Sequence, residues 1–483
     1  MSTATISEEP TAQETHVVLK RQIGLDRGNQ AALISLAAMT LNERNAVSTY
    51  VLLEEAARVG PLAAEAESLR AALFEQTRLE LELRPYLRAI GRVPLPRTER
   101  PRRILVVSNL FPPQELGGYG RMMWEFVQGL EHRGHEVRVV TADVPAWAKP
   151  PGPEEAAMEQ RVRRTLKLCG GWRDGRTLEA SAFEVATRNL ENIAATGAAI
   201  RDFKPEIVLA GNLDLLGAAV VETALAARLP VLHALANARP GFNAAALPRS
   251  PHYWMAPCSD WNGTALRDGG YAPVRMETLH PGARVDRFFR LFLPAAAPLR
   301  ICYASLVLPF KGPQLLVQAL VRLRRRGIDF TAEIAGEAPD PEFLADLRDV
   351  VTTAGLDDRV NFTGFLDRAG LSAMFGRGNV LVFPSKYPEP FGIAQVEAMA
   401  AGLVVVSSGT GGAKEIVRHE ANGLIFDPDR PEDLADQLAA LAQDAGLMAR
   451  LQRAGQARAA ELSVTQAVRR IEELAEEMLA SAR

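Results

Sequence analysis

The stretch Pro384-Ser-Lys-Tyr-Pro-Glu-Pro-Phe-Gly-Ile-Ala-Gln-Val-Glu-Ala-Met-Ala-Ala-Gly402 decides the fold of this 483-residue chain. The apolar run Asn379–Phe383 in front of it predicts a buried strand. A Pro-rich loop follows, then Gly392, a helix-forming segment and a stop at Gly402. A strand, a loop and a helix in this order indicate the edge of an α/β sheet at which open sheets bind their ligands.

Two glutamates flank this strand-to-helix junction, with seven residues between them. Glu389 lies on the loop just past the strand, and Glu397 lies about one turn into the helix. Backbone N–H groups at the expected helix start favour an anion at the same place. These groups belong to Phe391, Gly392 and Ile393. The alternative is that both glutamates lie on the surface beside a helix start, where the helix dipole favours acids.

The stretch resembles the E-x7-E signature of the retaining, nucleotide-sugar-dependent glycosyltransferases of family 4. The resemblance is carried by Glu389-Pro-Phe-Gly392, Glu397-Ala-Met-Ala-Ala-Gly402 and the downstream Gly411-Gly412-x-x-Glu415. It covers about residues 102–480. The implied fold is the GT-B architecture, an α/β fold of two facing Rossmann-like doubly wound domains. An α-helical N-terminal region precedes these domains.

The resemblance implies roles for particular residues. Glu389 would bind hydroxyls of the donor sugar and steady positive charge on its ring. Glu397 would accept hydrogen bonds from the two ribose hydroxyls, and Lys311 would hold phosphate. The predicted catalytic residues are Glu389, Lys311 and His233. The predicted donor-binding residues are Gly117, Gly118, Phe391, Gly392, Ile393 and Glu397.

Two of these assignments come from strand ends in the first domain. His233 ends the strand Leu229–Ala234, where related enzymes often place a histidine beside the donor sugar; a structural role is the alternative. Gly117 and Gly118 follow the strand Arg103–Asn109 in a turn whose N–H groups can meet the donor diphosphate.

The chain departs from the family pattern ahead of Lys311. The family usually has a Gly-Arg pair there, and Ser305 and Leu306 occupy the aligned positions. The donor diphosphate would then be held by Lys311, helix N-termini and the Gly-Gly loop. Either another cation substitutes for the arginine, or catalysis is weak.

Four regions are expected along the chain: a helical accessory region over residues 1–95, an acceptor domain over 102–288, a nucleotide-sugar domain over 289–462 and a final helix over 463–483 that crosses back to the first domain. Strands alternating with helices predict parallel sheets. Residues 145–180 are expected to be irregular. Residues 91–103 carry five arginines, which suit either a solvated linker or a contact with anionic lipid or an acidic acceptor.

Residues 1–95 show apolar positions at helical spacing and resemble half of a tetratricopeptide pattern. The face includes Leu33, Leu36, Tyr50 and Leu53. Because one such repeat cannot bury its own face, the region is expected to pack on the catalytic body, on a second copy of the chain or on a protein partner. It is interpreted as an accessory cap or as a recruitment module.

Composition narrows the classes of protein. Hydrophobic residues make up 47% of the chain and charged residues 23%, as in globular proteins, and the net charge of −3 argues against a nucleic-acid binder. Three scattered cysteines suit a reducing compartment and show no metal-ligand spacing. Without a recognisable signal peptide or membrane-length apolar run, the expected location is cytoplasmic, with peripheral contact at the inner face of a membrane left open.

The expected function is transfer of a sugar from a nucleoside-diphosphate sugar to a hydroxyl acceptor, with retention at the anomeric carbon, as in polysaccharide biosynthesis. The acceptor would be a glycan, a lipid-linked molecule or a small molecule. No metal and no other cofactor is expected, because fixed dipoles and cations can stabilise the leaving diphosphate. Two alternatives remain: a degenerate, non-catalytic GT-B subunit, suggested by Leu306, and a nucleotide-sugar epimerase.

Overall fold

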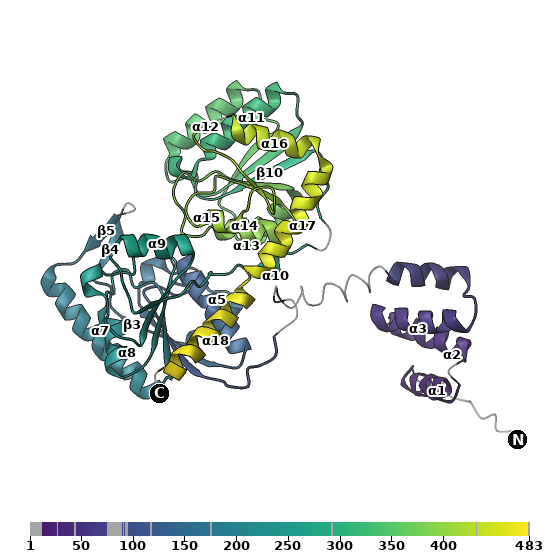
Figure 1. The fold of residues 1–483 in the computed structure, drawn as a ribbon, viewed down its shortest axis with the longest axis horizontal. Helices are drawn as coiled ribbons and strands as arrows, with labels where there is room; N and C mark the ends of the chain where they lie inside the picture. The colour runs from purple at the N-terminus through teal and green to yellow at the C-terminus, as the bar shows by residue number, and fades with distance from the viewer. Residues whose placement is uncertain are drawn as a thin grey trace, which may run out of the picture. The chain divides into compact units, whose positions relative to one another are not determined.

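The computed structural model describes residues 12–26, 28–42, 45–74, 89, 91, 95–115, 118–173, 176–290, 293–430 and 432–481. The chain divides into two compact units, Met1–Leu87 and Arg88–Arg483 (Figure 1). Each unit is described by itself.

The first unit is helical. It contains α1 (Ala12–Leu25), α2 (Gln30–Asn42), α3 (Ala46–Val59) and a further helical stretch over residues 64–74. Leu33, Leu36 and Leu53 are buried, and Leu53 packs with Ala37 and Leu73. The helices of the unit therefore cover the apolar face, which corrects the expectation that another surface must bury it.

The second unit begins with a seven-stranded parallel sheet in the order β3-β2-β1-β6-β7-β8-β9. Its strands are β1 (Arg103–Ser108), β2 (Glu136–Ala142), β3 (Val162–Leu166), β6 (Ile207–Ala210), β7 (Val231–Leu235), β8 (Tyr253–Pro257) and β9 (Arg275–Met276). One face packs on α5 (Tyr119–His132) and the other on α7 (Ala182–Phe203), α8 (Ala219–Ala226) and α9 (Asp260–Asp268). Strands covered on both faces read as continuous apolar runs, which is why their positions could be predicted.

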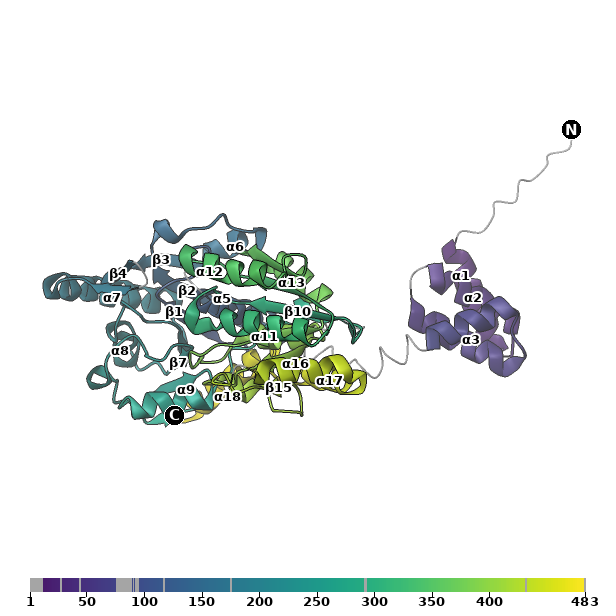
Figure 2. The same cartoon turned by 90° about the horizontal axis from the view of Figure 1, so that it is seen from above.

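A second parallel sheet of six strands has the order β12-β11-β10-β13-β14-β15. Its strands are β10 (Leu299–Ala304), β11 (Phe330–Ala335), β12 (Val360–Gly364), β13 (Val380–Phe383), β14 (Val404–Ser407) and β15 (Leu424–Ile425). One face is covered by α11 (Pro313–Arg325), α12 (Pro341–Thr353), α16 (Asp433–Gln443) and α17 (Ala445–Glu461). Figure 2 shows α12, α11 and α16 side by side. The second unit also contains four shorter helices: α10 (Val285–Phe288), α13 (Arg368–Arg377), α14 (Ile393–Ala400) and α15 (Ala413–Ile416). The predicted fold class is confirmed.

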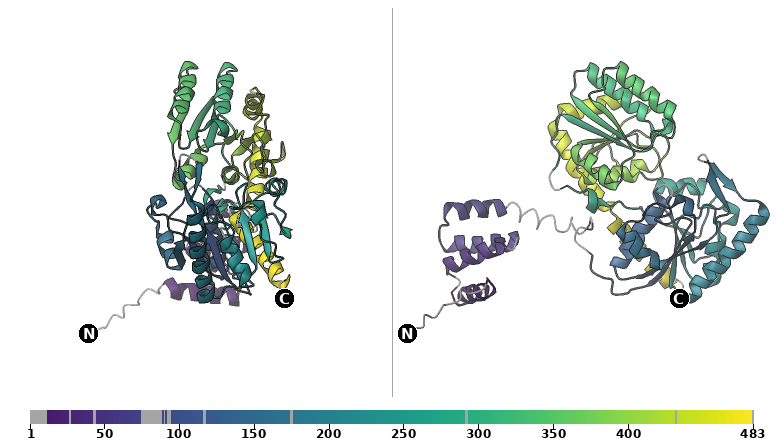
Figure 3. Two further views of the ribbon diagram at one scale, coloured as in Figure 1. Left: turned by 90° about the vertical axis from the view of Figure 1, so that its left-hand side faces the viewer. Right: turned by 180° about the vertical axis from the view of Figure 1, so that it is seen from behind.

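The last helix, α18 (Val464–Ser481), packs on the first domain, although it follows the second in the sequence (yellow in Figure 3). Its apolar face joins the core formed by α5. The helices approach so closely that a Cβ added at Gly129 would lie 2.4 Å from Val468 Cγ2. Glu472 accepts a hydrogen bond from Arg133 Nε at 2.9 Å and contacts His135 Nε2 at 2.9 Å. Helix α18 thus ties the two domains together.

Residues 145–180 contain more regular structure than was expected. They form α6 (Pro153–Met158), the edge strand β3 and a hairpin of β4 (Gly170–Arg173) with β5 (Arg176–Glu179). The 3₁₀ turns of the second unit are η1 (Pro145–Trp147), η2 (Glu159–Arg161), η3 (Ala244–Ala246) and η4 (Pro309–Lys311). Because these elements are short and contain prolines and charged residues, the sequence shows no clear helix or strand periodicity of apolar residues there.

Candidate active site

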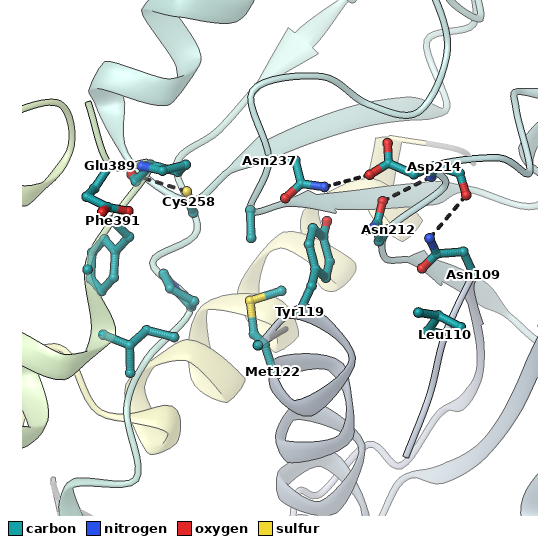
Figure 4. Close-up of a pocket in the computed structure, with 16 residues that line it drawn as sticks. Asn109, Leu110, Tyr119, Met122, Asn212, Asp214, Asn237, Cys258, Glu389 and Phe391 are labelled. Atoms are coloured by element: carbon teal, nitrogen blue, oxygen red, sulfur yellow. Dashed lines mark hydrogen bonds between the residues drawn. The ribbon is translucent and has the colours of Figure 1, made fainter. Parts of the chain in front are cut away.

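Loops at the carboxyl ends of both sheets line a cleft of about 440 Å³ (Figure 4). The first domain contributes Asn109, Leu110, Gly118, Tyr119, Met122, Asn212, Asp214, Ala236, Asn237, Cys258 and Pro281. The second domain contributes Glu389, Pro390, Phe391, Gly392 and Ile393. The cleft therefore lies where open α/β sheets bind ligands, with one wall from each domain.

Lys311 and Glu389 form an ion pair at this cleft. Because β10 and β13 are neighbours, η4 at the end of one and the loop after the other bring the two side chains together. Lys311 Nζ binds Glu389 Oε1, and Ser385 Oγ donates to the same oxygen at 2.9 Å. The ammonium also lies 5.6 Å from the ring centres of Phe310 and Tyr387. A cation is thus paired with a carboxylate that lines the cleft.

Glycines let the loops that carry this pair pack closely. Gly312 has φ +75°, and a Cβ there would lie 2.0 Å from the carbonyl oxygen of Pro384. A Cβ at Gly412 would lie 2.1 Å from the carbonyl oxygen of Pro390. Neither position can hold a side chain without moving the loop. The Gly-Gly of the sequence motif therefore supports the loop that carries Glu389.

The start of α14 faces the cleft as well. Phe391, Gly392 and Ile393 all line it, and Gly392 precedes the helix with φ +105°. The first N–H groups of a helix have no carbonyl partner within that helix, and the dipole there favours negative charge. An anion in the cleft would meet these groups.

Glu397 lies deeper than the sequence suggested. Its side chain is 2% exposed and does not line the cleft. Arg368 Nη2, at the start of α13, donates to Glu397 Oε1 at 2.6 Å. Burial raises the pKa of Glu397, while the charge and hydrogen bond of Arg368 lower it. In this structure the glutamate is satisfied by an arginine that was not predicted.

His233 is also placed away from the cleft. It is completely buried, with Nδ1 2.7 Å from Tyr253 Oη and Nε2 2.9 Å from the carbonyl oxygen of Gly211. Burial lowers its pKa to about 3, so the ring is neutral. The structure places this histidine in the core of the first domain, and its predicted role beside the donor sugar stays a prediction.

The turn ahead of α5 is only partly described. Gly118 lines the cleft and precedes the helix, and a Cβ there would meet nothing within 4 Å. Gly117 lies outside the described residues. Leu306, at the position of the missing arginine, is 40% exposed on the loop after β10.

The domains also meet through Glu415, which belongs to the downstream part of the motif. Its carboxylate accepts hydrogen bonds from the N–H groups of Asp260 at 3.0 Å and Trp261 at 2.7 Å, at the start of α9. Burial raises the pKa of Glu415, but His280 and these N–H groups outweigh it and leave the pKa lowered. The motif of the second domain thus caps a helix of the first.

Family models match both domains. The model of "Glycosyl transferase 4-like domain" matches residues 117–269, and that of "Glycosyl transferases group 1" matches residues 290–458. The chain belongs to the family 4 glycosyltransferases. It is therefore a transferase of the GT-B type.

Two curated relatives of this glycosyltransferase align with most of the chain. A GDP-mannose-dependent alpha-(1-6)-phosphatidylinositol monomannoside mannosyltransferase of Mycobacterium tuberculosis is 29% identical over 365 residues, 71% of this chain and 89% of the relative. A glycogen synthase of the same organism is 27% identical over 383 residues, 74% of this chain and 90% of the relative.

Solved structures share the fold. A glycosyltransferase from Rickettsia africae superposes with a TM-score of 0.63 at 18% identity, covering 79% of this chain and 99% of that one. HepE from Anabaena, in complex with UDP and glucose, gives a TM-score of 0.57 at 20% identity and covers 78% of this chain and 100% of that one.

Sequence reasoning missed the polar residues of the first-domain wall. Asn109, Asp214 and Asn237 follow β1, β6 and β7, which are neighbours in the sheet. The available signal was a polar residue after each of three apolar strands. Without the strand order, nothing indicated that these three ends meet.

Two absences hold for the described part of the chain. No helix there is long and apolar enough to cross a membrane. No group of three or more His, Cys, Asp or Glu side chains is placed to hold a metal ion among these residues.

Proposed function

We propose that this glycosyltransferase moves a sugar from a nucleoside-diphosphate sugar to a hydroxyl acceptor and retains the anomeric configuration. The Lys311–Glu389 ion pair at the cleft, beside the start of α14, carries the proposal. Two comparisons support the donor class: one relative is named as GDP-mannose-dependent, and HepE was crystallised with UDP and glucose.

Glycosyl transfer develops positive charge on the sugar ring and negative charge on the leaving diphosphate. Lys311 and the N–H groups at the start of α14 would stabilise that diphosphate, because fixed charges and dipoles need no rearrangement during the reaction. The bond from the anomeric carbon to phosphate breaks, and the bond to the acceptor oxygen forms on the same face. The acceptor proton passes to the leaving phosphate.

Glu389 would change partners when the donor binds. In the structure its carboxylate forms an ion pair with Lys311. A diphosphate would take over the lysine, and the carboxylate would then be free to bind sugar hydroxyls and to steady positive charge on the ring. Each charged hydrogen bond exchanged in this way contributes about 1.5–3 kcal/mol, so the exchange can be close to balanced.

The proposal requires no metal ion, since Lys311 and helix dipoles are assigned the charge of the diphosphate. Turnover should then persist in excess EDTA.

Cytoplasmic location, peripheral contact with a membrane and participation in polysaccharide synthesis remain part of the proposal. Arg102 of the arginine-rich linker is already engaged, pairing with Glu206 at 3.0 Å and Glu476 at 2.8 Å.

A panel of UDP-, GDP- and ADP-sugars tests the donor class. Thermal shift reports nucleotide binding, since a ligand that binds only the folded protein raises the midpoint by mass action. Release of the nucleoside diphosphate reports turnover, and NMR of the product reports the anomer. Binding, turnover and a retained anomer are expected. Binding without turnover of any sugar nucleotide would instead support a non-catalytic subunit, the reading suggested by Leu306, and an inverted anomer would remove retention.

A further inference from the structure

A second cavity, of about 450 Å³, lies in the Arg88–Arg483 unit and is here called the α5–α18 pocket. Its walls include residues of α5, of α18 and of the segment that leads into α10. Helices α5 and α18 are in contact along this part of the molecule (Figure 1). None of the described residues lines both this pocket and the cleft. The volume falls within the range of small-molecule sites, about 300–1,000 Å³.

Glu125 of α5 lines the pocket with a carboxyl group that has no partner. The residue is 8% exposed, and its side chain makes no hydrogen bond or ion pair within the described chain. Burying a charged carboxylate costs free energy unless a cation or several donors accompany it. Without a cation beside Glu125 the protonated form is favoured, whereas a cation in the pocket would favour the ionised form.

The arginines that line the pocket are already held by other carboxylates. Arg284 donates from Nε to Asp286 Oδ1 at 2.9 Å and from Nη2 to Asp286 Oδ2 at 2.7 Å. Arg133 donates from Nε to Glu472 Oε1 at 2.9 Å. Both cations are therefore matched by acids of their own, and neither forms an ion pair with Glu125.

Charged residues of the neighbouring helices are matched in the same way. Arg287 of α10 lies 3.8 Å from Glu154 of α6, and Arg368 of α13 donates to Glu397 of α14 at 2.6 Å. Burial raises the pKa of Glu125 to about 7, against the positive charge of these arginines, which lowers it. Glu125 is the buried acid of this region that lacks a cation.

The side of the pocket formed by α18 is apolar. Val464 and Val468 line it, and α18 contributes no charged residue to the described lining. An apolar stem can lie on these valines while a charged head reaches the carboxyl group of Glu125. His132, an exposed residue of α5, is the other described lining residue of a type that changes charge near neutral pH.

We propose that the α5–α18 pocket binds a small alkylamine, with its ammonium group on the carboxylate of Glu125 and its hydrocarbon stem on Val464 and Val468. The site is separate from the cleft and independent of the glycosyl-transfer function. An ammonium group brings a positive charge and three N–H donors, which is what the buried carboxylate lacks. An anion would instead meet Glu125 and arginines that other carboxylates already hold.

Matched ligands test the chemical class. The full-length protein is titrated with n-butylamine and with 1-butanol, which has the same stem without the charge, in an amine-free phosphate buffer of fixed ionic strength. Calorimetry gives the affinity, and the thermal midpoint reports binding to the folded state. At pH 8 the amine should raise the midpoint at millimolar concentration and bind at least about tenfold more tightly than the alcohol. No midpoint shift with the amine, or equal affinities for amine and alcohol, overturns the proposal.

The dependence of the affinity on pH tests the carboxyl group without a substitution. Alkylammonium groups stay charged between pH 6 and 8, whereas Glu125 ionises in this range, so the affinity for n-butylamine should rise about tenfold from pH 6 to pH 8. His132→Gln should show the same rise. An affinity that does not change with pH, or a rise that disappears in His132→Gln, overturns the assignment of the ammonium group to Glu125.

Glu125→Gln keeps the shape of the side chain and removes its charge. The variant should bind n-butylamine about tenfold or more weakly than the parent at pH 8, the loss expected for one charge-assisted hydrogen bond, and its affinity should no longer rise with pH. Glu222→Gln, at an exposed glutamate of α8, is the matched control and should bind as the parent does. Equal affinities of the parent and Glu125→Gln for the amine overturn the proposal.

Discussion

The carboxylate of Glu397 is buried, and among the described residues the side chain of Arg368 is its hydrogen-bond donor. A buried carboxylate keeps its charge only when such a partner or several donors are present. Ribose hydroxyls could replace or join Arg368 on this carboxylate when a nucleotide binds. The pair is thus either a resting state of the nucleotide site or a purely structural contact.

Two variants separate these roles. If Glu397 binds ribose, Glu397→Gln should weaken nucleoside-diphosphate binding about tenfold or more, because a charged acceptor is lost. Arg368→Gln leaves the carboxylate in place and should keep or improve the affinity. Calorimetric titration with the nucleotide gives both values. Equal losses of thermal midpoint in the two variants with unchanged affinity would make the pair structural.

The sequence motif could predict the positions of residues that belong to the same strand–loop–helix unit. Glu389 and the start of α14 belong to one strand–loop–helix unit, so their neighbourhood follows from local order. Arg368 and Asp214 could not be found, because their partners Glu397 and Asn237 lie 29 and 23 residues away. His233 was expected to end its strand but is the middle residue of β7, where every side chain is buried. The sequence could not show this, because strand boundaries and the direction of each side chain depend on the packing of the sheet.

At the scale of elements, helix α5 carries a buried carboxyl group, that of Glu125. Glu125 is 8% exposed, and its side chain forms no hydrogen bond or ion pair with the described residues. Burial raises its pKa to about 7, although the charges of Arg368 and Arg284 act in the opposite direction. The helix therefore holds an acid that is protonated below neutral pH.

This carboxyl predicts a pH dependence of stability. An unfolded glutamate has a pKa of about 4.3, so between about pH 4.3 and 7 the folded state binds one proton more than the unfolded state. The contribution of Glu125 to the free energy of unfolding therefore falls as pH rises through that window and is constant above it. Glu125→Gln removes the loss, so its free energy of unfolding should exceed that of the parent by about 4 kcal/mol above pH 7, with little difference near pH 4.

Thermal midpoints of the parent and Glu125→Gln between pH 4 and 8 check this, with Glu222→Gln at an exposed helical position as the control. A difference that stays the same at every pH would show that Glu125 does not titrate in this window.

Regular elements were predictable where both faces of a strand are buried. The alternation of apolar strands with helices indicated two parallel sheets, and the structure contains them. The hairpin β4–β5 and the edge strand β3 were missed; in β3 the only buried side chain is that of Leu166, so the strand lacks a continuous apolar run. Helices α18 and α5 are in contact although they lie more than 300 residues apart in the sequence. Arg133, for example, donates a hydrogen bond to Glu472.

For the whole molecule, the main question is what the first unit does. The large apolar cores of the second unit are built from described residues of that unit itself. A protein of residues 88–483 should therefore fold, keep its thermal midpoint and hydrolyse donor as the full chain does. Loss of transfer to a natural acceptor alone would assign the first unit to recruitment. Aggregation of the truncated protein would instead show that the first unit covers an apolar surface of the body.

Donor turnover by Lys311→Ala tests the central claim most directly. Lys311 is the cation paired with Glu389, which lines the cleft, and Leu306 stands where the family usually has an arginine. Removing one group that stabilises developing charge costs about 2.7–4 kcal/mol in the barrier, so turnover should fall about 10²–10³-fold. Lys20→Ala, at an exposed lysine of the first unit, should match the parent. Turnover in Lys311→Ala equal to that of the parent would contradict the account.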